Sequence, residues 1–280
     1  MTDTTLTADQ RGTGEYADVN GIRLYYETHG PADAARTLIL LHGGLGSGDD
    51  FDTILPALTE GRKAVTVDLQ GHGRTADIDR PIDHRLMADD IAALILHLGL
   101  DRPDVLGYSL GGGVAAFLAA RHPELVGKAV ILSANVRRNA IYPEMLALQE
   151  QVGAPTVDQL KGTPMYELYQ RVAPNPANFG RLLDKIGALM ATDFDYSDVV
   201  RSLKVPTLIA CADADMAPPS HYVEVFKLLD GGLRDGGWMG EGRPRGGHAL
   251  AIVPGATHYN VARSPVLAAA VVDFLDTPTT

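Results

Sequence analysis

A serine between two glycines is the feature of this chain that most directly suggests chemistry. Ser109 lies in the sequence Gly107-Tyr108-Ser109-Leu110-Gly111, directly after an apolar run that predicts a strand and directly before a segment that predicts a helix. The glycines on either side allow a turn so tight that the serine hydroxyl stands at the end of the strand, where it can act as a nucleophile. The backbone N–H of Leu110, at the start of the helix, is predicted to face the same point and to donate to an oxyanion.

A glycine-rich loop predicts a second oxyanion donor. Residues 41–46 have the sequence LHGGLG and follow the first long apolar run. Acyl transfer needs N–H groups aimed at the developing negative charge, and a glycine-rich loop lets the backbone approach it closely. We expect Gly44 to supply this N–H, with Leu45 as the near alternative. His42 is expected to shape the loop rather than to act as a base, because another histidine is better placed.

The other members of a catalytic triad are predicted in the last third of the chain. His258 follows the last apolar run, in the sequence VPGATHYN, and is the expected general base. The acid that orients it is expected after the preceding strand, where the sequence LIACADADMAPP supplies Asp213 and Asp215. Asp215 is the preferred acid and Asp213 the fallback. Capping of a helix near Pro218-Pro219 is the alternative role for this pair.

The order of apolar runs and helical segments predicts an α/β fold with a doubly wound, mostly parallel sheet. Asn20-Gly21 is expected to join two short strands in a hairpin at the front edge. The later runs lack alternation of apolar and polar residues, as expected for parallel strands that helices cover on both faces. These runs are 37–41, 64–67, 104–106, 129–132, 207–211 and 250–253. Asp83 and Ser264 are expected to cap the helices that follow them.

The same pattern divides the chain into a core and an insertion. The expected units are a loose tail over 1–14, a core over 15–136 and 198–280, a helical cap over 137–197, and a glycine-rich loop over 231–247 within the core. The insertion contains helical segments and no convincing strand, and it is expected to lie over the carboxyl edge of the sheet, where ligands bind in open α/β sheets. The glycine-rich loop is expected to be a flexible connector, with a contact surface around Trp238 as the alternative.

Together these motifs resemble the α/β-hydrolase superfamily, more narrowly its serine-nucleophile members with a helical cap. The resemblance covers about residues 15–136 and 200–278, and it rests on HGG, DLQGHGRT at 68–75, GYSLGG, the D-A-D-x-x-x-P run and PGATH. It implies a triad in the chain order Ser, Asp, His, and structural roles for Asp68 and His72. Similar proteins that open epoxides or remove halides carry an aspartate at the position of Ser109, so those activities are disfavoured.

The resemblance points to a serine hydrolase that cleaves an ester or lactone and needs no metal or organic cofactor. Similar C–C bond hydrolases tend to carry an asparagine at the position of Tyr108, which disfavours that reaction without excluding it. A cofactor-free perhydrolase or haloperoxidase needs the same triad and stays as an alternative. A ligand-binding receptor on the same fold is the non-enzymatic alternative, since fold alone does not fix function.

The cap is expected to select the substrate. The residues predicted to line an apolar pocket above the nucleophile are Tyr108, Tyr142, Met145, Tyr166 and Tyr169, joined by Met165, Phe179 and Met190. For any one of them, packing of the cap onto the sheet is the alternative, because apolar stripes at helical spacing usually form core. A largely apolar cap favours an apolar or amphipathic substrate, from a small aryl ester to a bulky lactone such as a macrolide.

Composition excludes several other classes of protein. The chain has 280 residues, with 24 Lys and Arg against 35 Asp and Glu, and its formal charge of −11 argues against general binding to nucleic acid or anionic membranes. Cys211 is the only cysteine and the histidines lack a pair of the H-E-x-x-H type, so no metal site is expected. The chain also lacks the patterns of a membrane span or a signal peptide. We therefore expect a cytoplasmic protein that binds a small-molecule substrate, and its oligomeric state stays open.

Overall fold

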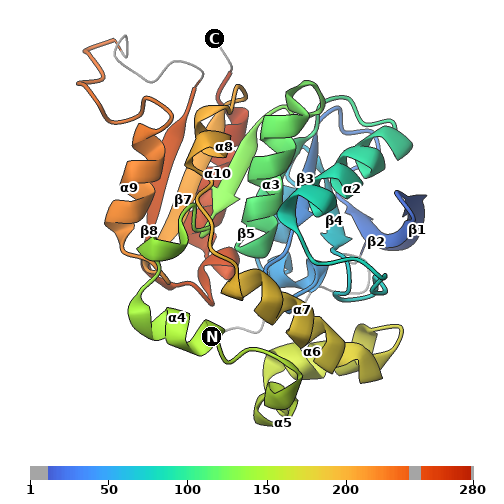
Figure 1. The fold of residues 1–280 in the computed structure, drawn as a ribbon. Coiled ribbons are helices and arrows are strands. Elements are labelled where there is room, and N and C mark those ends of the chain that lie inside the picture. Colours follow the sequence, from blue (N-terminus) through green and yellow to red (C-terminus); the bar gives the residue numbers. More distant parts are fainter. Residues whose placement is uncertain (1–11, 240–246, 279–280) are drawn as a thin grey trace.

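The computed structural model describes residues 12–239 and 247–278, and it shows an eight-stranded sheet between two layers of helices (Figure 1). The strand order is β1-β2-β4-β3-β5-β6-β7-β8. The strands from β3 to β8 are parallel, whereas β1 pairs antiparallel with β2 and β2 antiparallel with β4. The strands are β1 (Thr13–Val19), β2 (Ile22–His29), β3 (Thr37–Leu41), β4 (Lys63–Asp68), β5 (Asp104–Tyr108), β6 (Ala129–Leu132), β7 (Thr207–Ala214) and β8 (Ala249–Thr257). This topology confirms the predicted, mostly parallel α/β sheet with a hairpin at one edge.

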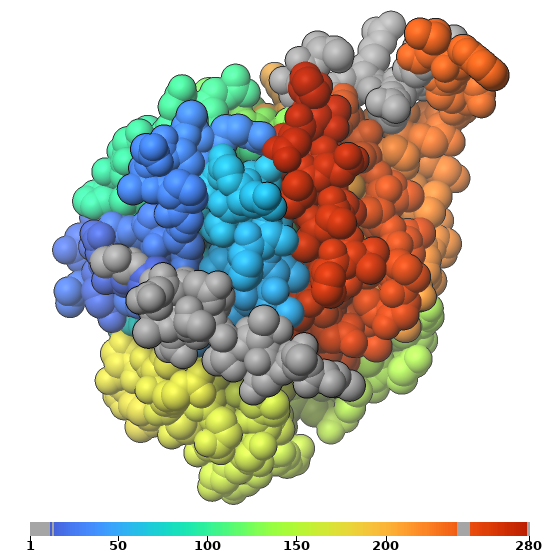
Figure 2. Space-filling view, turned by 180° about the vertical axis from the view of Figure 1, so that it is seen from behind, coloured from blue at the N-terminus to red at the C-terminus, as the bar shows by residue number. Residues whose placement is uncertain are grey.

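Helices cover both faces of the sheet. Helices α2, α3, α8 and α9 pack on one face, and α1 and α10 pack on the other. Figure 2 shows the second face, with α10 in red beside the light-blue segment that contains α1. The helices are α1 (Leu55–Leu58), α2 (His84–His97), α3 (Leu110–Arg121), α4 (Pro143–Gln149), α5 (Val157–Leu160), α6 (Pro164–Val172), α7 (Phe179–Ala191), α8 (Ser197–Arg201), α9 (Pro219–Lys227) and α10 (Pro265–Asp276). The side chains of Asp83 and Ser264 cap α2 and α10 as predicted.

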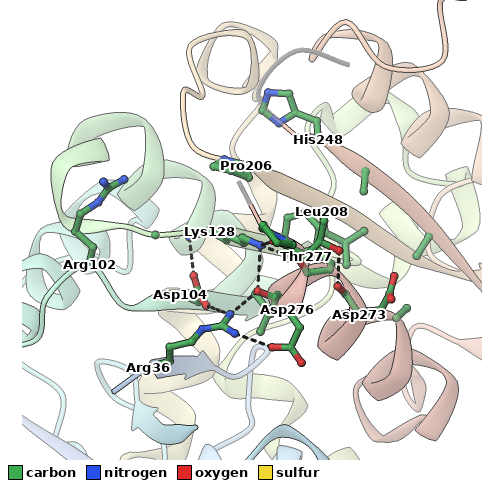
Figure 3. Close-up of a pocket in the computed structure, with 18 of the residues that line it drawn as sticks. Arg36, Arg102, Asp104, Lys128, Pro206, Leu208, His248, Asp273, Asp276 and Thr277 are labelled. Carbon is green, nitrogen blue, oxygen red and sulfur yellow. Dashed lines mark hydrogen bonds and ion pairs between the residues drawn. The ribbon is translucent and has the colours of Figure 1, made fainter. Parts of the chain in front are cut away.

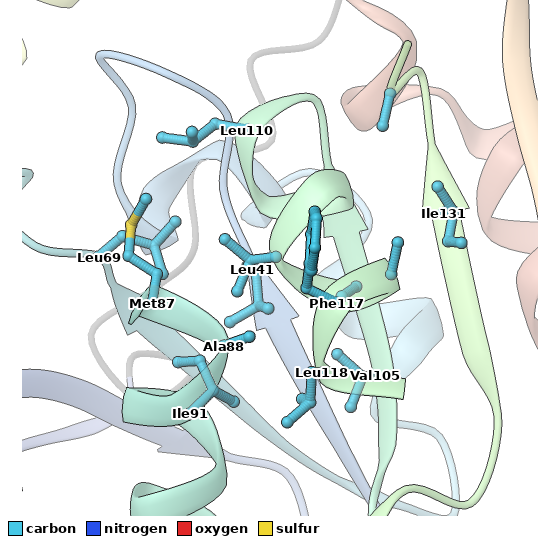
Figure 4. Packing of buried hydrophobic residues seen from close by; sticks show 14 of the residues in the cluster. Leu41, Leu69, Met87, Ala88, Ile91, Val105, Leu110, Phe117, Leu118 and Ile131 are labelled. Carbon is cyan, nitrogen blue, oxygen red and sulfur yellow. The ribbon is translucent and has the colours of Figure 1, made fainter. Parts of the chain in front are cut away.

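Alternate residues of the central strands supply two separate cores, because successive side chains of a strand point to opposite faces. Leu41 and Ile131 pack beneath α2 and α3 together with Phe117 (Figure 4). Their strand neighbours Leu40 and Leu132 belong to the cluster that packs against α1 and α10. Both faces of these strands are therefore buried, which explains why their sequences lack polar alternation.

Two strands continue farther than their apolar runs predict. Strand β7 continues past Cys211 to Ala214, and β8 continues past Val253 to Thr257. The pairing shifts register after Ala212 and resumes between the last residues of the two strands. Backbone pairing does not require apolar side chains, so the sequence signal stops earlier than the strands do.

The two ends of the expected core also differ from prediction. Strand β1 begins at Thr13, so the last residues of the expected 1–14 tail belong to the sheet. Residues 1–11 lie outside the described residues, as do residues 240–246 of the glycine-rich segment. Before that gap, the side chain of Trp238 is 97% exposed.

The insertion between β6 and β7 forms helices α4 to α7, at the bottom of Figure 1. An isolated antiparallel bridge between Arg137 and Asp195 joins the two points where the chain enters and leaves the insertion. Helix α7 is held to the core by Lys185, whose ammonium donates to the Asp77 carboxylate at 2.8 Å and to the Ile78 carbonyl at 2.7 Å. Polar contacts thus anchor α7, one helix of the insertion, to the core.

A cavity of about 1000 Å³ lies at the amino ends of the strands, at the opposite edge of the sheet from the insertion (Figure 3). Several of its charged groups pair with other groups of the protein. The ammonium of Lys128 donates to the carbonyls of Phe274 at 2.9 Å and Leu275 at 3.0 Å, at the end of α10. Arg36 pairs with Asp276 at 2.7 Å. These contacts indicate that this edge anchors the last helix.

Replacing Lys128 by methionine is expected to lower the free energy of unfolding by about 1–3 kcal/mol, because the last carbonyls of α10 lose a charged donor. Chemical denaturation would measure the change. The matched control is Lys161→Met, which removes an exposed ammonium that pairs with Asp158 three residues away. Exposed pairs of this kind contribute little, so no measurable change is expected there. Equal stability of the two variants would contradict the anchoring role of Lys128.

Within the two described ranges, no helix combines the length and apolar character that a bilayer span requires.

Candidate active site

Three side chains from three different loops meet at the carboxyl edge of the sheet. Ser109 follows β5, Asp215 follows β7 and His258 follows β8. Nε2 of His258 lies 3.1 Å from Oγ of Ser109, and Nδ1 of His258 lies 2.7 Å from Oδ1 of Asp215. The structure thus joins the three predicted triad residues in one chain of hydrogen bonds, which is the arrangement that activates a serine in nucleophilic catalysis.

The backbone at Ser109 is strained, as the tight turn predicts. Its φ of 52° and ψ of −111° place it in a backbone region that residues other than glycine rarely adopt. A Cβ at Gly107 would overlap the carbonyl oxygen of Gly111, and a Cβ at Gly111 would overlap that of Leu41. The turn therefore requires both glycines. The N–H of Ser109 donates to the carbonyl of Leu132 at 2.8 Å and fixes the turn to the end of β6.

The loop after β3 lies directly against this turn. The N–H of Gly111 donates to the carbonyl of His42 at 3.0 Å, and a Cβ at Gly43 would lie 3.4 Å from the Cβ of Ser109. Within the described part of the chain, the N–H groups of Gly44 and Leu110 donate to no acceptor. A Cβ at Gly44 would have no neighbour within 4 Å. Their role as oxyanion donors stays a prediction.

The carboxylate of Asp215 is buried and held by several donors. Its Oδ1 accepts from His258 and from the N–H of Met216 at 2.8 Å. Its Oδ2 accepts from the hydroxyl of Ser133 at 2.5 Å and from the N–H of Ala212 at 3.1 Å. Burial by itself would raise the pKa of this carboxyl, but the hydrogen bonds, led by that of His258, hold the pKa below its usual value. Asp215 therefore stays ionised beside the histidine.

Asp213, the fallback acid, has a different role from either one predicted for it. Its exposed carboxylate accepts from the N–H of Gly255 at 2.8 Å and of Ala256 at 3.1 Å. It thus holds the turn that leads to His258. Capping of α9 by an aspartate is wrong, because α9 begins after Pro218 without a side-chain cap.

The geometry of His42 agrees with its predicted structural role. The N–H of Leu69 donates to Nε2 of His42 at 3.0 Å, so Nδ1 carries the proton and donates to the carbonyl of Gly43 at 2.7 Å. Burial lowers the pKa of His42 to about 4, which keeps the ring neutral. Asp68 is likewise used inside the fold, where it accepts from the N–H of Gly48 at 2.7 Å.

Tyr108, predicted to contact substrate, has its hydroxyl engaged elsewhere. The hydroxyl donates to the carbonyl of His258 at 2.5 Å, and the two rings lie 5.4 Å apart. A Cβ at Gly43 would lie 2.7 Å from the Tyr108 ring, so the ring also supports the glycine-rich loop. The prediction missed this positioning role because a contact across the sheet leaves no local sequence signal.

The predicted pocket residues of the cap fall into two groups. The N–H of Tyr142, at the start of α4, donates to the carbonyl of Met216 at 3.0 Å, beside the acid. Met145 lies half-buried on the same helix, so these two residues stay candidates for substrate contact. Tyr166 and Tyr169 instead pack against Phe179, with ring centroids 5.3 and 5.1 Å apart. For this pair the structure favours the packing alternative.

Two further residues that contact this region were missed in the sequence. Ser133 contacts Asp215 as described above, and the hydroxyl of Tyr222 lies 3.3 Å from Oδ1 of Asn135 in the loop after β6. Ser133 follows β6 directly, and the strand order places β6 between β5 and β7. Its position at the end of that strand was the one available signal. No cluster of three metal-binding side chains occurs among the described residues.

Comparison with known proteins gives the same fold independently. A family model described as the alpha/beta hydrolase fold matches residues 36–236. This chain belongs to the α/β-hydrolase family. It is 33% identical over 253 residues to a pimeloyl-[acyl-carrier protein] methyl ester esterase of Neisseria meningitidis serogroup B, covering 72% of this chain and 96% of that protein. It is 30% identical over 229 residues to the putative carbamate hydrolase RutD of Rhizobium rhizogenes, covering 74% of this chain and 85% of that protein.

Among solved structures, the enol-lactonase from Burkholderia xenovorans LB400 superposes with a TM-score of 0.69, over 94% of this chain and 100% of that chain. The two sequences are 21% identical, so this likeness concerns the fold alone. The named relatives are all hydrolases. In open α/β sheets, ligands bind at the carboxyl edge of the strands, which is the edge where Ser109, Asp215 and His258 lie in this α/β-hydrolase.

Proposed function

We propose that this α/β-hydrolase is a serine hydrolase that cleaves a carboxylic ester or lactone through an acyl-enzyme. The observation that carries the proposal is the hydrogen-bonded series of Ser109, His258 and Asp215, together with two N–H groups that have no acceptor among the described residues. The name of one relative, a methyl ester esterase, supports the same reaction class.

The first half of the proposed reaction forms the acyl-enzyme. The hydroxyl of Ser109 attacks the substrate carbonyl while Nε2 of His258 removes its proton. The N–H groups of Leu110 and Gly44 donate to the oxyanion, and each such donor contributes about 3 kcal/mol in enzymes of this kind. Asp215 holds the proton on Nδ1 of His258 and stabilises the imidazolium. The tetrahedral intermediate then releases the alcohol, which takes the proton from Nε2.

The second half regenerates the enzyme with the same groups. Water enters the site, His258 removes its proton, and the resulting hydroxide attacks the acyl carbonyl. The same two N–H groups stabilise the second oxyanion. Collapse of this intermediate releases the carboxylic acid and returns the proton to Ser109.

We propose that the helical insertion selects the substrate, as an apolar or amphipathic small molecule. Met145 lies on α4, and Tyr142, the residue before that helix, donates its N–H to the carbonyl of Met216 in the loop that contains the acid. This backbone contact joins the start of α4 to the residue after the acid, which supports the proposal. Substitution of Met145 by a charged residue would therefore affect KM more than kcat.

A panel of p-nitrophenyl esters from acetate to decanoate, extended with lactones, tests the proposed function. We expect steady turnover, with an optimum chain length that reflects the size of the acyl pocket. Peracid formation from hydrogen peroxide and a carboxylic acid, faster than ester hydrolysis, would favour a perhydrolase instead. A single slow turnover on every ester and lactone would contradict the enzymatic proposal and favour a receptor.

A further inference from the structure

Backbone strain is concentrated at the candidate active site. Among the described residues, six that are not glycine have a positive φ, namely Asn20, Leu45, Arg102, Ser109, Ser133 and Asp230. Three of the six, Leu45, Ser109 and Ser133, lie in the loops that follow β3, β5 and β6 at the carboxyl edge of the sheet. Such strain persists where the surrounding structure enforces it and clusters at functional sites. Ser109 and the loop that contains Leu45 already have a role, whereas Ser133 has none.

Ser133 is placed between the two ends of the triad. It is 1% exposed, and its hydroxyl donates to Oδ2 of Asp215 at 2.5 Å. Its N–H donates to the carbonyl of Ala210 at 2.7 Å, which fixes its backbone to β7, the strand that carries the acid. The preceding residue, Leu132, accepts the N–H of Ser109 at 2.8 Å. The end of β6 is therefore bonded to the nucleophile through one residue and to the acid through the next.

We propose that Ser133 is a positioning residue of the triad, whose hydroxyl orients the Asp215 carboxylate and sets how strongly that carboxylate attracts the proton on His258. The inference rests on the proposed function. The hydroxyl cannot reach a substrate, because it is buried beneath the acid. Its effect must therefore pass through Asp215 and His258.

The direction of the effect follows from the charge on the carboxylate. A hydroxyl that donates to Oδ2 of Asp215 withdraws negative charge from the oxygen that faces His258. Without this donor, Asp215 binds the imidazolium more strongly, and the pKa of His258 in the active enzyme rises. A larger fraction of His258 is then protonated near neutral pH and cannot accept the proton of Ser109.

The other titratable groups near Asp215 do not change their protonation over the pH range in which the rate would be measured. In the described part of the chain, those facing it are His258 after β8, Cys211 in β7, Tyr222 on α9, Tyr108 in β5 and Tyr259. Burial raises the pKa of Cys211 to about 12 and also raises the pKa of each of the three tyrosines. These four groups stay neutral between pH 5 and 9. Burial raises the pKa of Asp50, beside the glycine-rich loop, to about 6, so the test compares the acid limb of each Ser133 variant with that of wild type, which carries the same Asp50.

The experiment measures kcat/KM against pH for wild type, Ser133→Ala and Ser133→Gly. Both variants lose the hydroxyl, whereas only glycine relieves the positive φ, so the glycine variant keeps the test valid if alanine fails to fold. We expect the acid limb to move up by about half to one pH unit in both variants. We also expect kcat/KM on the acid limb to fall about 3- to 10-fold, which is the loss that such a shift produces, with KM unchanged.

The matched control is Ser197→Ala, which removes another buried serine hydroxyl that bonds a carboxylate, that of Asp195, away from the triad. Its pH profile is expected to match that of wild type. Loss of activity in both Ser133 variants without movement of the acid limb would overturn the proposal, because a merely structural role lowers the rate equally at every pH.

A second readout separates this inference from the proposed function. The pKa of His258 can be followed by NMR of its imidazole nitrogens, without any substrate. If wild type shows no turnover on any ester or lactone but the pKa of His258 still rises in both Ser133 variants, the hydrolase proposal fails and the positioning role stands. An unchanged pKa of His258 in both variants would overturn the positioning role whatever the activity.

Discussion

Replacing Ser109 by alanine is expected to lower kcat for esters by roughly 10⁵- to 10⁶-fold, because the variant lacks the atom that attacks the carbonyl. The substitution keeps a Cβ at the strained position, so the strain at φ 52° is unchanged and the fold is expected to persist. Steady-state kinetics with a p-nitrophenyl ester would measure the loss, and thermal unfolding would show that the variant is folded.

The control for this prediction is Ser220→Ala, which removes an exposed hydroxyl on α9. Its kcat is expected to equal that of wild type. Retention of more than a hundredth of the wild-type kcat in folded Ser109→Ala would contradict the nucleophilic role of Ser109.

Replacing Asp215 by asparagine is expected to lower kcat by about 10⁴-fold, although the shape of the side chain is conserved. The amide no longer stabilises an imidazolium, and it can donate to Nδ1 of His258, which then presents the wrong tautomer to Ser109. The carboxylate is buried and accepts four hydrogen bonds, so water cannot replace its charge. Kinetics at several pH values would measure the loss.

Asp213→Asn is the matched control, since the two aspartates lie two residues apart and differ in their partners. Asp213 accepts the N–H groups of Gly255 and Ala256, and an amide oxygen can still accept one of them. We expect kcat to fall less than 10-fold. A larger loss of kcat in Asp213→Asn than in Asp215→Asn would indicate that Asp213 is the acid, and would contradict the assignment of Asp215.

The parts of the fold and site that the sequence predicted are those with a local physical cause. The strand that ends at Leu41 was found because both of its faces are buried, which leaves an unbroken apolar run. The turn at Ser109 was found because steric contact excludes a Cβ at Gly107 and Gly111. The cap of α2 was found because an aspartate that bonds the first N–H groups of a helix lies next to it in the chain.

The parts that escaped prediction depend on contacts between distant segments. Ser133 and Asp215 are separated by the whole helical insertion, and only the strand order brings them together. The bond from Tyr108 to the carbonyl of His258 spans the sheet in the same way. Helical spacing could not decide whether Tyr169 faces a pocket or the interior of the cap, because both positions carry apolar side chains.

Covalent trapping of the nucleophile tests the central claim most directly. The wild-type protein would be incubated with a fluorophosphonate, digested and examined by mass spectrometry, with His258→Ala as the control that lacks the base. The proposed mechanism predicts one phosphonyl group per chain, on the peptide that contains Ser109, and little labelling of His258→Ala. Ester turnover without an adduct on Ser109, or an adduct on another residue, would contradict it.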